Sequence, residues 1–419
     1  MDSTAPSMKT QLAALLLVSF TASALAQGGA LTPPGAPAPT MRSLQEIWDK
    51  VSTLEALAQS QQTQITQLQS LNTTLTQQNV MVQTQNNQML QNAGLPLQWN
   101  TALLDETPSG VGSASSLAFL PDGTPVVACV TQNGLNLILE TLNGAAWQSE
   151  VITTGTGLAL PSLVFDPAGQ PVVAFSDSVN GVRVARKTGG TWSFTSVDAS
   201  GVAAKAAYDP AGRLRIGYVV PGAPSVVKLA TLTGVIWSFE TVASDVGITL
   251  ATSLAITPAG HPAMAYLDQV NGDMKYTVFN GTSWSTTTVD ADSTALSVRL
   301  RFSPTTGHAA LVYDATDLQG IRYASSDGST WTVSLVGMSG GPDFVFNPLG
   351  RPVIASGGST LRVATFNGTA FEIKVVDGTT STGTVLSAAL GADHLPAISY
   401  YDSAGQRLRF ARPGFVGGN

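Results

Sequence analysis

One stretch of the chain, Ser162–Asp198, alternates short apolar runs with turn residues in a pattern that predicts four β-strands. Pro171–Phe175 is an apolar, β-branched run too short for a helix, which is typical of a buried strand. Val182–Lys187 alternates apolar and charged residues, as a half-exposed strand does. The short run Ser162–Phe165 comes before them, and the outer run Thr191–Asp198 follows a Gly-Gly hairpin. The stretch is therefore predicted to form one small four-stranded sheet.

The same plan recurs through most of the chain from residue 95 to residue 415. The Asp-Pro-Ala-Gly turn at 166–169 has counterparts at 121–123, 209–212, 257–260, 303–307 and 347–350. A later hairpin is followed by an aromatic residue in most units: Trp147, Trp192, Trp237, Trp284, Trp331 and Phe371. A period of roughly 43–48 residues with four strands per unit is the signature of β-propeller blades, which bury their faces only against their neighbours.

The number of blades follows from the ends of the first strands. These ends are predicted at seven positions: Phe119, Phe165, Tyr208, Ile256, Phe302, Phe346 and Leu390. The seventh unit runs out after its third strand, Arg407–Ala411, but Leu97–Asp105 matches the missing outer strand and carries Trp99. We therefore predict an all-β, seven-bladed propeller over residues 95–415, closed by an N-terminal outer strand that removes an open sheet edge.

Residues 41–92 follow a different pattern, with a heptad repeat after a Pro/Gly/Ala-rich linker at 27–40. The heptad core positions are Leu44, Ile47, Val51, Leu54, Ala58, Gln61, Ile65, Leu68, Asn72, Leu75, Asn79, Val82, Asn86 and Met89. This pattern predicts an α-helical coiled-coil stalk, in which buried asparagines fix the register at some cost in stability. The chain would then be a parallel homo-oligomer, with trimer favoured over dimer. The alternative is a Gln/Asn-rich disordered tether.

The first 26 residues have the three regions of a secretory signal peptide. Lys9 gives the positive n-region, Leu12–Phe20 the apolar h-region and Ala24–Ala26 the cleavage site. Translation from Met8 instead of Met1 is an open alternative. We expect a protein of bacterial type that is secreted or displayed at the cell surface, or held in the periplasm, with no transmembrane segment after cleavage. An uncleaved N-terminal anchor is the alternative.

Charge and cysteine content narrow the classes of function. The net charge is −7 and no basic stripe is present to displace counterions from phosphate, so we expect no nucleic-acid partner. The single cysteine, Cys129, falls in a predicted buried strand, which excludes a disulfide framework. We find no metal-ligand spacing, phosphate-binding loop or catalytic triad, and expect no metal, cofactor or catalytic residue.

The second turns of four units carry acidic residues, on the propeller face where ligands usually bind. These candidate ligand-binding residues are Asp177, Asp268, Asp314 and Asp402. Their carboxylates could accept hydrogen bonds from sugar hydroxyls, whereas a calcium site would need more oxygen ligands than each loop provides. The alternative is structural, because Asp in a turn commonly bonds its own backbone.

Six tryptophans occupy one repeat position or its equivalent: Trp99, Trp147, Trp192, Trp237, Trp284 and Trp331. Because this position recurs once per blade just after a hairpin, we interpret it as a packing position between blades. Stacking against sugar rings is the alternative.

The hairpin Ser325–Trp331 resembles the Asp-box of sialidase-like (BNR-repeat) propellers, although it lacks the residue expected between Asp327 and Gly328. The blades also resemble those of fucose-binding propeller lectins, which place a tryptophan near the outer strand. This resemblance implies a propeller fold and carbohydrate binding. The arginine triad, tyrosine nucleophile and acid of sialidases have no counterpart that we can place on this sequence.

Three functional hypotheses follow from these observations. The first is a secreted, oligomeric, lectin-like binding protein whose propeller head recognises glycans or an extracellular protein without catalysis. The second is a glycan-active enzyme, a sialidase-like hydrolase or a lyase, which would need clustered acids and arginines in a deep pocket. The third is a purely structural extracellular module. Propellers host all three, so the fold by itself does not choose between them.

Overall fold

The computed structural model describes residues 39–92, 97–104 and 111–415, except 132, 145, 245, 248, 249, 292, 294, 316–319 and 379–381. Most of the N-terminal helix belongs to one unit of the chain and the strands belong to another. The signal peptide and most of the linker predicted at the N-terminus lie outside the described residues. Both stay predictions.

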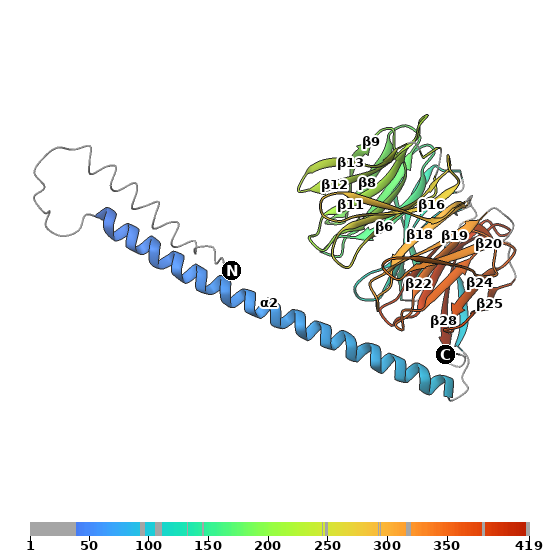
Figure 1. The fold of residues 1–419 in the computed structure, drawn as a ribbon, viewed down its shortest axis with the longest axis horizontal. Helices are drawn as coiled ribbons and strands as arrows, with labels where there is room; N and C mark the ends of the chain where they lie inside the picture. Colours follow the sequence, from blue (N-terminus) through green and yellow to red (C-terminus); the bar gives the residue numbers. More distant parts are fainter. Residues whose placement is uncertain are drawn as a thin grey trace, which may run out of the picture. The chain divides into compact units, whose positions relative to one another are not determined.

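α2 (Pro39–Asn92) is a single helix of 54 residues (Figure 1). At 1.5 Å per residue such a helix is about 80 Å long. Several heptad side chains along it are exposed, including Leu54 at 62% and Leu68 at 65%. The helix predicted here is confirmed, whereas its association into a coiled coil stays a prediction. Among the described residues, no helix is both long enough and apolar enough to span a membrane.

The strands form seven four-stranded sheets, which we number as blades 1 to 7 in chain order. Blades 1 to 3 contain β2 (Val111–Phe119), β3 (Pro125–Thr131), β4 (Asn136–Asn143), β5 (Ala146–Thr154), β6 (Ala159–Phe165), β7 (Pro171–Asp177), β8 (Gly181–Thr188), β9 (Thr191–Asp198), β10 (Val202–Tyr208), β11 (Leu214–Val220), β12 (Val226–Thr233) and β13 (Ile236–Ser244). Blades 4 to 6 contain β14 (Thr252–Ile256), β15 (Pro262–Asp268), β16 (Asp273–Phe279), β17 (Trp284–Asp290), β18 (Ala295–Phe302), β19 (Ala309–Ala315), β20 (Gly320–Ser326), β21 (Trp331–Leu335), β22 (Pro342–Phe346), β23 (Pro352–Ser356), β24 (Leu361–Phe366) and β25 (Phe371–Asp377). Blade 7 contains β26 (Thr382–Leu390), β27 (Pro396–Asp402), β28 (Arg407–Phe415) and β1 (Leu97–Leu103).

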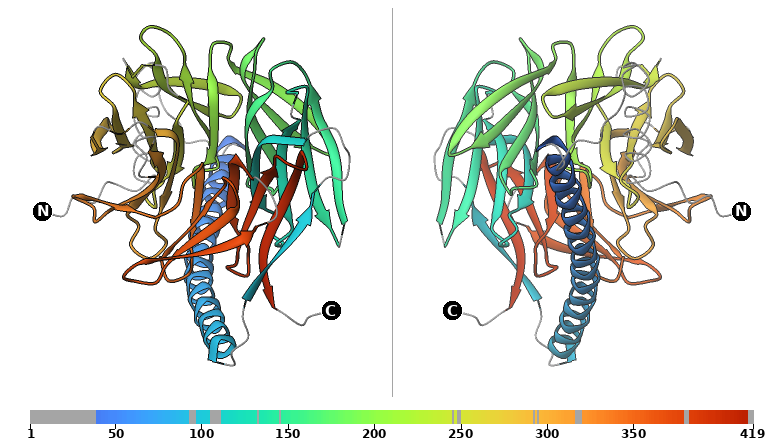
Figure 2. Two further views of the ribbon diagram at one scale, coloured as in Figure 1. Left: turned by 90° about the vertical axis from the view of Figure 1, so that its right-hand side faces the viewer. Right: turned by 90° about the vertical axis from the view of Figure 1, so that its left-hand side faces the viewer.

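The sheets lie around a ring, and the strands of each sheet follow one another from the inside to the outside (Figures 1 and 2). In blade 7 the outer strand comes from the other end of the domain, because β1 pairs antiparallel with β28, from Leu97↔Phe415 to Leu103↔Arg409. The seven-bladed propeller predicted from the sequence is confirmed. All seven inner strands end at the predicted residues.

The apolar core is divided into seven clusters, each between two neighbouring blades. The cluster between blades 1 and 2, for example, joins Leu137 to Phe175. The cluster between blades 7 and 1 joins Phe410 to Val127. The ring is therefore closed by side-chain packing as well as by the pairing of β1 with β28.

The repeated tryptophans pack against the preceding blade, as the sequence indicates. The ring centroid of Trp147 lies 5.3 Å from that of Phe410 in blade 7, and that of Trp331 lies 5.2 Å from that of Tyr276 in blade 4. The others border the corresponding inter-blade clusters: Trp99, Trp192, Trp237 and Trp284. Each ring thus joins its outer strand to the neighbouring sheet.

Three blade junctions also contain a buried tyrosine that donates a hydrogen bond to an aspartate at the end of the preceding outer strand. The pairs are Tyr218–Asp198 at 3.0 Å, Tyr313–Asp290 at 2.7 Å and Tyr400–Asp377 at 2.6 Å. Burial and the neighbouring carboxylate raise the pKa of all three phenols. The hydroxyl therefore stays protonated and acts as the donor at neutral pH.

Replacing Tyr400 by Phe should destabilise the domain, because it removes this donor and keeps the ring. A hydrogen bond to a charged acceptor contributes about 1.5–3 kcal/mol, so we expect the free energy of unfolding in guanidinium chloride to fall by about 2 kcal/mol.

The neighbouring Tyr401 provides a matched control for this substitution. Its hydroxyl is buried and has no hydrogen-bond partner within the described part of the chain. Tyr401→Phe should therefore leave stability unchanged or raise it. Equal losses for the two variants would contradict the role assigned to the Tyr400–Asp377 bond.

Candidate functional site: the central channel

The inner strands of the seven blades wall a central cavity of about 380 Å³. One position, three residues before the end of each inner strand, contributes a polar or charged side chain from every blade. We call these residues the channel ring: Ser116, Ser162, Lys205, Ser253, Arg299, Asp343 and Ser387. A cavity of this size lies within the usual range for small-ligand sites.

Five members of the channel ring bond to the next blade. In each case a side-chain oxygen accepts a hydrogen bond from a backbone N–H of the next inner strand, at 2.9–3.0 Å. The acceptor and donor residues are Ser116 and Leu163, Ser162 and Ala206, Ser253 and Leu300, Asp343 and Ala388, and Ser387 and Leu117. At these positions the ring thus links successive blades around the channel.

Lys205 and Arg299, the two remaining members, place positive charge in the channel, and Arg301 adds a third cation. Two of these cations share the carboxylate of Asp343, which is 4% exposed. Arg299 Nε lies 3.6 Å from Asp343 Oδ2 and Arg301 Nη2 lies 3.2 Å from Oδ1. The same carboxylate accepts two backbone N–H groups, so its lone pairs are largely occupied.

Lys205 differs from the two arginines because it makes no hydrogen bond or ion pair with any described residue. Burial lowers its pKa to about 7; the nearby charge of Arg299 also lowers the pKa, whereas that of Asp343 raises it. The Lys205 ammonium therefore loses its proton far more readily than a lysine in water. Because the channel has three cations and one carboxylate, it can accept a further negative charge.

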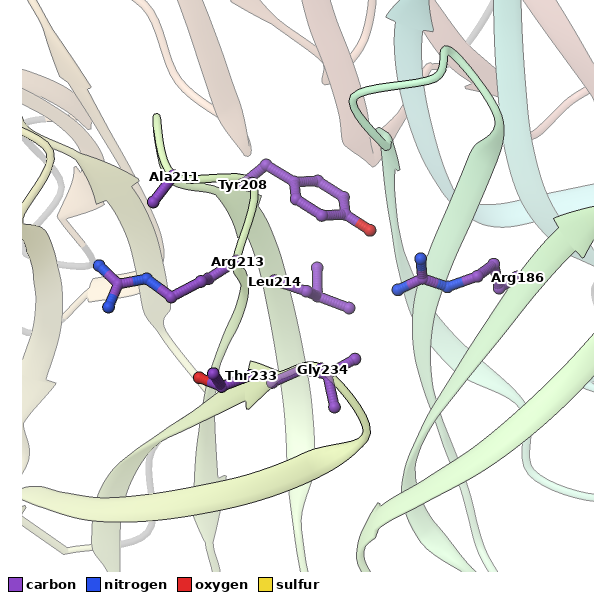
Figure 3. Close-up of a pocket in the computed structure, with 9 residues that line it drawn as sticks. Arg186, Tyr208, Ala211, Arg213, Leu214, Thr233 and Gly234 are labelled. Carbon is purple, nitrogen blue, oxygen red and sulfur yellow. The ribbon is translucent and has the colours of Figure 1, made fainter. Parts of the chain in front are cut away.

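A second cavity, of about 560 Å³, lies between blades 2 and 3 beside the first turn of blade 3. Arg186 of β8 lines one side, and the hydroxyl of Tyr208, at the end of β10, points toward it (Figure 3). Burial raises the pKa of Tyr208, and the Arg186 cation partly offsets this. Both arginines of this cavity, Arg186 and Arg213, lie beside aspartates, at 3.8 and 2.7 Å. The channel, with its unpaired Lys205, is the stronger candidate site.

Three of the four predicted ligand-binding carboxylates hold their own turns together. Asp177 accepts from the N–H of Val179 at 2.8 Å, Asp268 from that of Val270 at 3.2 Å, and Asp402 from that of Ala404 at 3.1 Å. Burial raises the pKa of Asp177, but hydrogen bonds from the turn and from Arg183 outweigh it and lower the pKa overall.

Asp314 is bonded differently from the other three. Its carboxylate accepts the backbone N–H of Leu296 at 3.1 Å and that of Ser297 at 2.7 Å, which lie in β18 of the same blade. Burial raises the pKa of Asp314 more than these bonds lower it. The four carboxylates come from four different blades and none lines the central cavity. A ligand-binding role for them stays a prediction.

The charged residues of the channel bear on the enzymatic hypothesis. Glycoside hydrolysis generally requires a pair of carboxyl groups. Among the described residues that line the channel, Asp343 is the carboxylate, and it is held by two arginines. No group of three or more His, Cys, Asp or Glu with metal-site geometry was found in the described part of the chain. The channel residues therefore favour binding of an anion over acid–base catalysis by paired carboxylates.

Sequence reasoning did not single out Lys205, Arg299, Arg301 or Asp343. A signal for three of them was present, because aligning the seven inner strands by their last residue places serine at four ring positions and charge at the other three. Charge at a position that is serine in the other blades departs from the repeat pattern, and this departure could have singled out the three residues.

Comparison with known proteins identifies the fold and leaves the function open. No family model matches this chain, and no curated protein matches it. Among solved structures, YCF48 bound to D1 peptide has a TM-score of 0.52 and 14% identity, over 75% of this chain and 96% of that one. An Aleuria aurantia lectin in complex with Fucα1-6GlcNAc has a TM-score of 0.45 and 16% identity, over 64% of this chain and 96% of that one. The Hadza microbial sialidase Hz136 has a TM-score of 0.44 and 11% identity, over 70% of this chain and 73% of that one.

These similarities place the chain in the class of β-propellers. A sialidase and a fucose-bound lectin are among the solved structures to which the chain is similar, and the seven four-stranded sheets confirm the propeller fold that the sequence resemblance implied. At 16% identity or less, similarity to these structures does not show which ligand this chain binds or which activity it has.

The low pKa of Lys205 leads to a test of the channel's electrostatics. Acetylation by acetic anhydride requires the neutral amine, so its pH–rate profile should have a midpoint near pH 7 at Lys205, against a reference pKa of about 10.4 for lysine in peptides. Peptide mass spectrometry would measure the profile, with Lys374 on the exposed face of β25 as the internal comparison. Profiles that coincide for the two lysines would show that Lys205 is not desolvated.

Proposed function

We propose that this chain is an extracellular, oligomeric binding protein whose propeller head binds an anionic ligand in the central channel. The observation that carries this proposal is the set of three cations around one carboxylate, in a cavity lined by every blade. Asp343 already accepts two arginines and two backbone N–H groups. A second anion from a ligand would pair with Lys205 and share the remaining donors of Arg299.

Such a site fits the anionic group of a glycan, such as a carboxylated sugar, or of an extracellular protein. Charge-assisted hydrogen bonds to a carboxylate are stronger than neutral ones, and the partly desolvated channel strengthens them further. The second-turn residues Asp177, Asp268, Asp314 and Asp402 stay candidates for additional contacts on the other face. The alternatives are a glycan-active enzyme and a structural module.

The exposed heptad of α2 supports oligomerisation of this head. Ile65 is 47% exposed and Leu68 is 65% exposed, although both occupy core positions of the heptad. Burial of such residues between helices is the driving force of a coiled coil. We propose a parallel homo-oligomer, trimer or dimer, in which linked heads convert weak single sites into avidity.

Secretion is the remaining part of the proposal. It is supported by the apolar run at residues 12–20 and the small-x-small site at 24–26. Export would bring the heads to glycans and proteins outside the cell or at its surface.

Anion binding in the channel should weaken as pH rises through 7, because Lys205 loses its charge there. We expect the affinity for glucuronate, measured by isothermal titration calorimetry, to fall about tenfold between pH 6 and pH 8, which corresponds to the loss of about 1.4 kcal/mol. Lys205→Met should lower the affinity at pH 6 and abolish the pH dependence.

The control for Lys205→Met is Lys374→Met, which removes one positive charge from the outside of blade 6. It should leave both the affinity and its pH dependence unchanged. If both variants bind glucuronate as the unmodified protein does, anion binding at Lys205 is ruled out.

Lysine at the heptad core should dissociate the stalk. We expect the double substitution Ile65→Lys and Leu68→Lys to convert the oligomer to monomers in sedimentation equilibrium, because each charge would have to be buried between helices. Gln67→Lys, at an outward heptad position of the same turn, controls for charge and should leave the mass unchanged. A monomeric unmodified chain would contradict the coiled coil.

A further inference from the structure

We propose that the channel ligand is an amphipathic carboxylate, with its charged head at the channel ring and an apolar body at the channel mouth. This inference rests on the proposed anion binding and narrows its ligand class. It is carried by a second set of residues, which line the mouth and were not used in the proposal above.

The mouth holds a cavity of about 470 Å³ whose lining side chains are apolar apart from that of Arg301. Its walls include Ile256, Phe302, Phe346 and Leu390, which are the last residues of four inner strands. Ile256, Phe302 and Leu390 are half-buried, so part of each side chain borders the cavity. Arg301 is the charged residue among those that line it.

The mouth cavity and the channel cavity adjoin each other. Both are lined by Leu254, Leu300, Arg301 and Leu390. Along β18 the channel-ring residue Arg299 comes three residues before Phe302, a rise of about 10 Å at about 3.3 Å per residue. A medium-length acyl chain, or a phenyl ring on a short linker, spans that distance.

The channel ring and the channel mouth differ in chemistry, and this difference discriminates between ligands. A carboxylate at the ring would find Lys205 without a partner and Arg299 only partly engaged. The next few ångströms of the ligand would lie beside the apolar side chains of the mouth, which form no hydrogen bonds with sugar hydroxyls. A ligand with an apolar body gains affinity there instead.

Two sources provide this chemistry, a free acid and the C-terminal residue of a polypeptide with an apolar side chain. Both present one carboxylate and one apolar group. In the second source the bound residue is joined to the rest of a polypeptide, which would have to run out through the channel mouth. A free acid carries no such chain.

Calorimetric titration of the full chain at pH 6 would test the inference, with 4-phenylbutyrate, octanoate and glucuronate as free acids. Acetyl-Gly-Phe with a free carboxylate, and the same peptide as its C-terminal amide, test the polypeptide source. We expect the apolar acids to bind at least tenfold more tightly than glucuronate and the peptide amide not to bind. Binding of the peptide acid in preference to octanoate would identify a chain terminus as the source; the reverse would identify a free acid.

The variant Phe302→Ala should weaken octanoate binding about tenfold and leave glucuronate binding unchanged. Phe165→Ala is its matched control, since Phe165 ends the inner strand of blade 2 at the same repeat position and does not line the mouth cavity. The two variants should be equally stable, while only Phe302→Ala changes octanoate affinity.

The outcomes separate this inference from the proposal on which it rests. Suppose that glucuronate and octanoate bind with equal affinity and that Lys205→Met abolishes the binding of both. This result would overturn the inference that the ligand has an apolar body, and it would leave the proposed anion binding in place. Failure of every carboxylate to bind would overturn both. If Phe302→Ala and Phe165→Ala changed the affinity for octanoate equally, the proposed role of the channel mouth would also be overturned.

Discussion

A four-stranded sheet with two apolar faces cannot bury them by itself, and this constraint shapes the whole domain. Each blade instead shares one core with the blade before it and another with the blade after it. Once seven such junctions close on themselves, the inner strands are held at a fixed distance from the axis. The channel thus results from packing between the blades, and five channel-ring residues add hydrogen bonds between neighbouring inner strands. The two ring positions without such a bond, Lys205 and Arg299, are free to carry other properties.

The channel ring shows how one position can serve two purposes. Where it is serine, its hydroxyl ties two inner strands together through a backbone N–H group. In blades 3 and 5 a cation stands there, and in blade 6 Asp343 both accepts the backbone bond and holds two arginines. The charge is thus concentrated on one side of an otherwise neutral ring. An asymmetric field of this kind orients a ligand as well as attracting it.

Much of the fold could be predicted because its signals are local. Turn chemistry and strand length located the ends of the inner strands, from Phe119 to Leu390, and heptad spacing located α2. The tendency of Asp177 and Asp402 to bond their own turns is local chemistry of the same kind. Lys205 and Asp343 could not be predicted from the sequence in the same way, because closure of the ring brings them close together. Desolvation lowers the pKa of Lys205, and it too leaves no pattern in the neighbouring sequence.

The origin of β1 has a mechanical consequence. In blade 7 the N-terminal strand lies outermost, held by seven residue pairs to the C-terminal strand β28. The chain enters β1 only a few residues after α2 ends. Tension transmitted through the helix would therefore load the β1–β28 ladder before any other sheet. The strand that closes the ring is also its point of attachment, so the force at which this ladder yields limits the pull that the propeller can withstand.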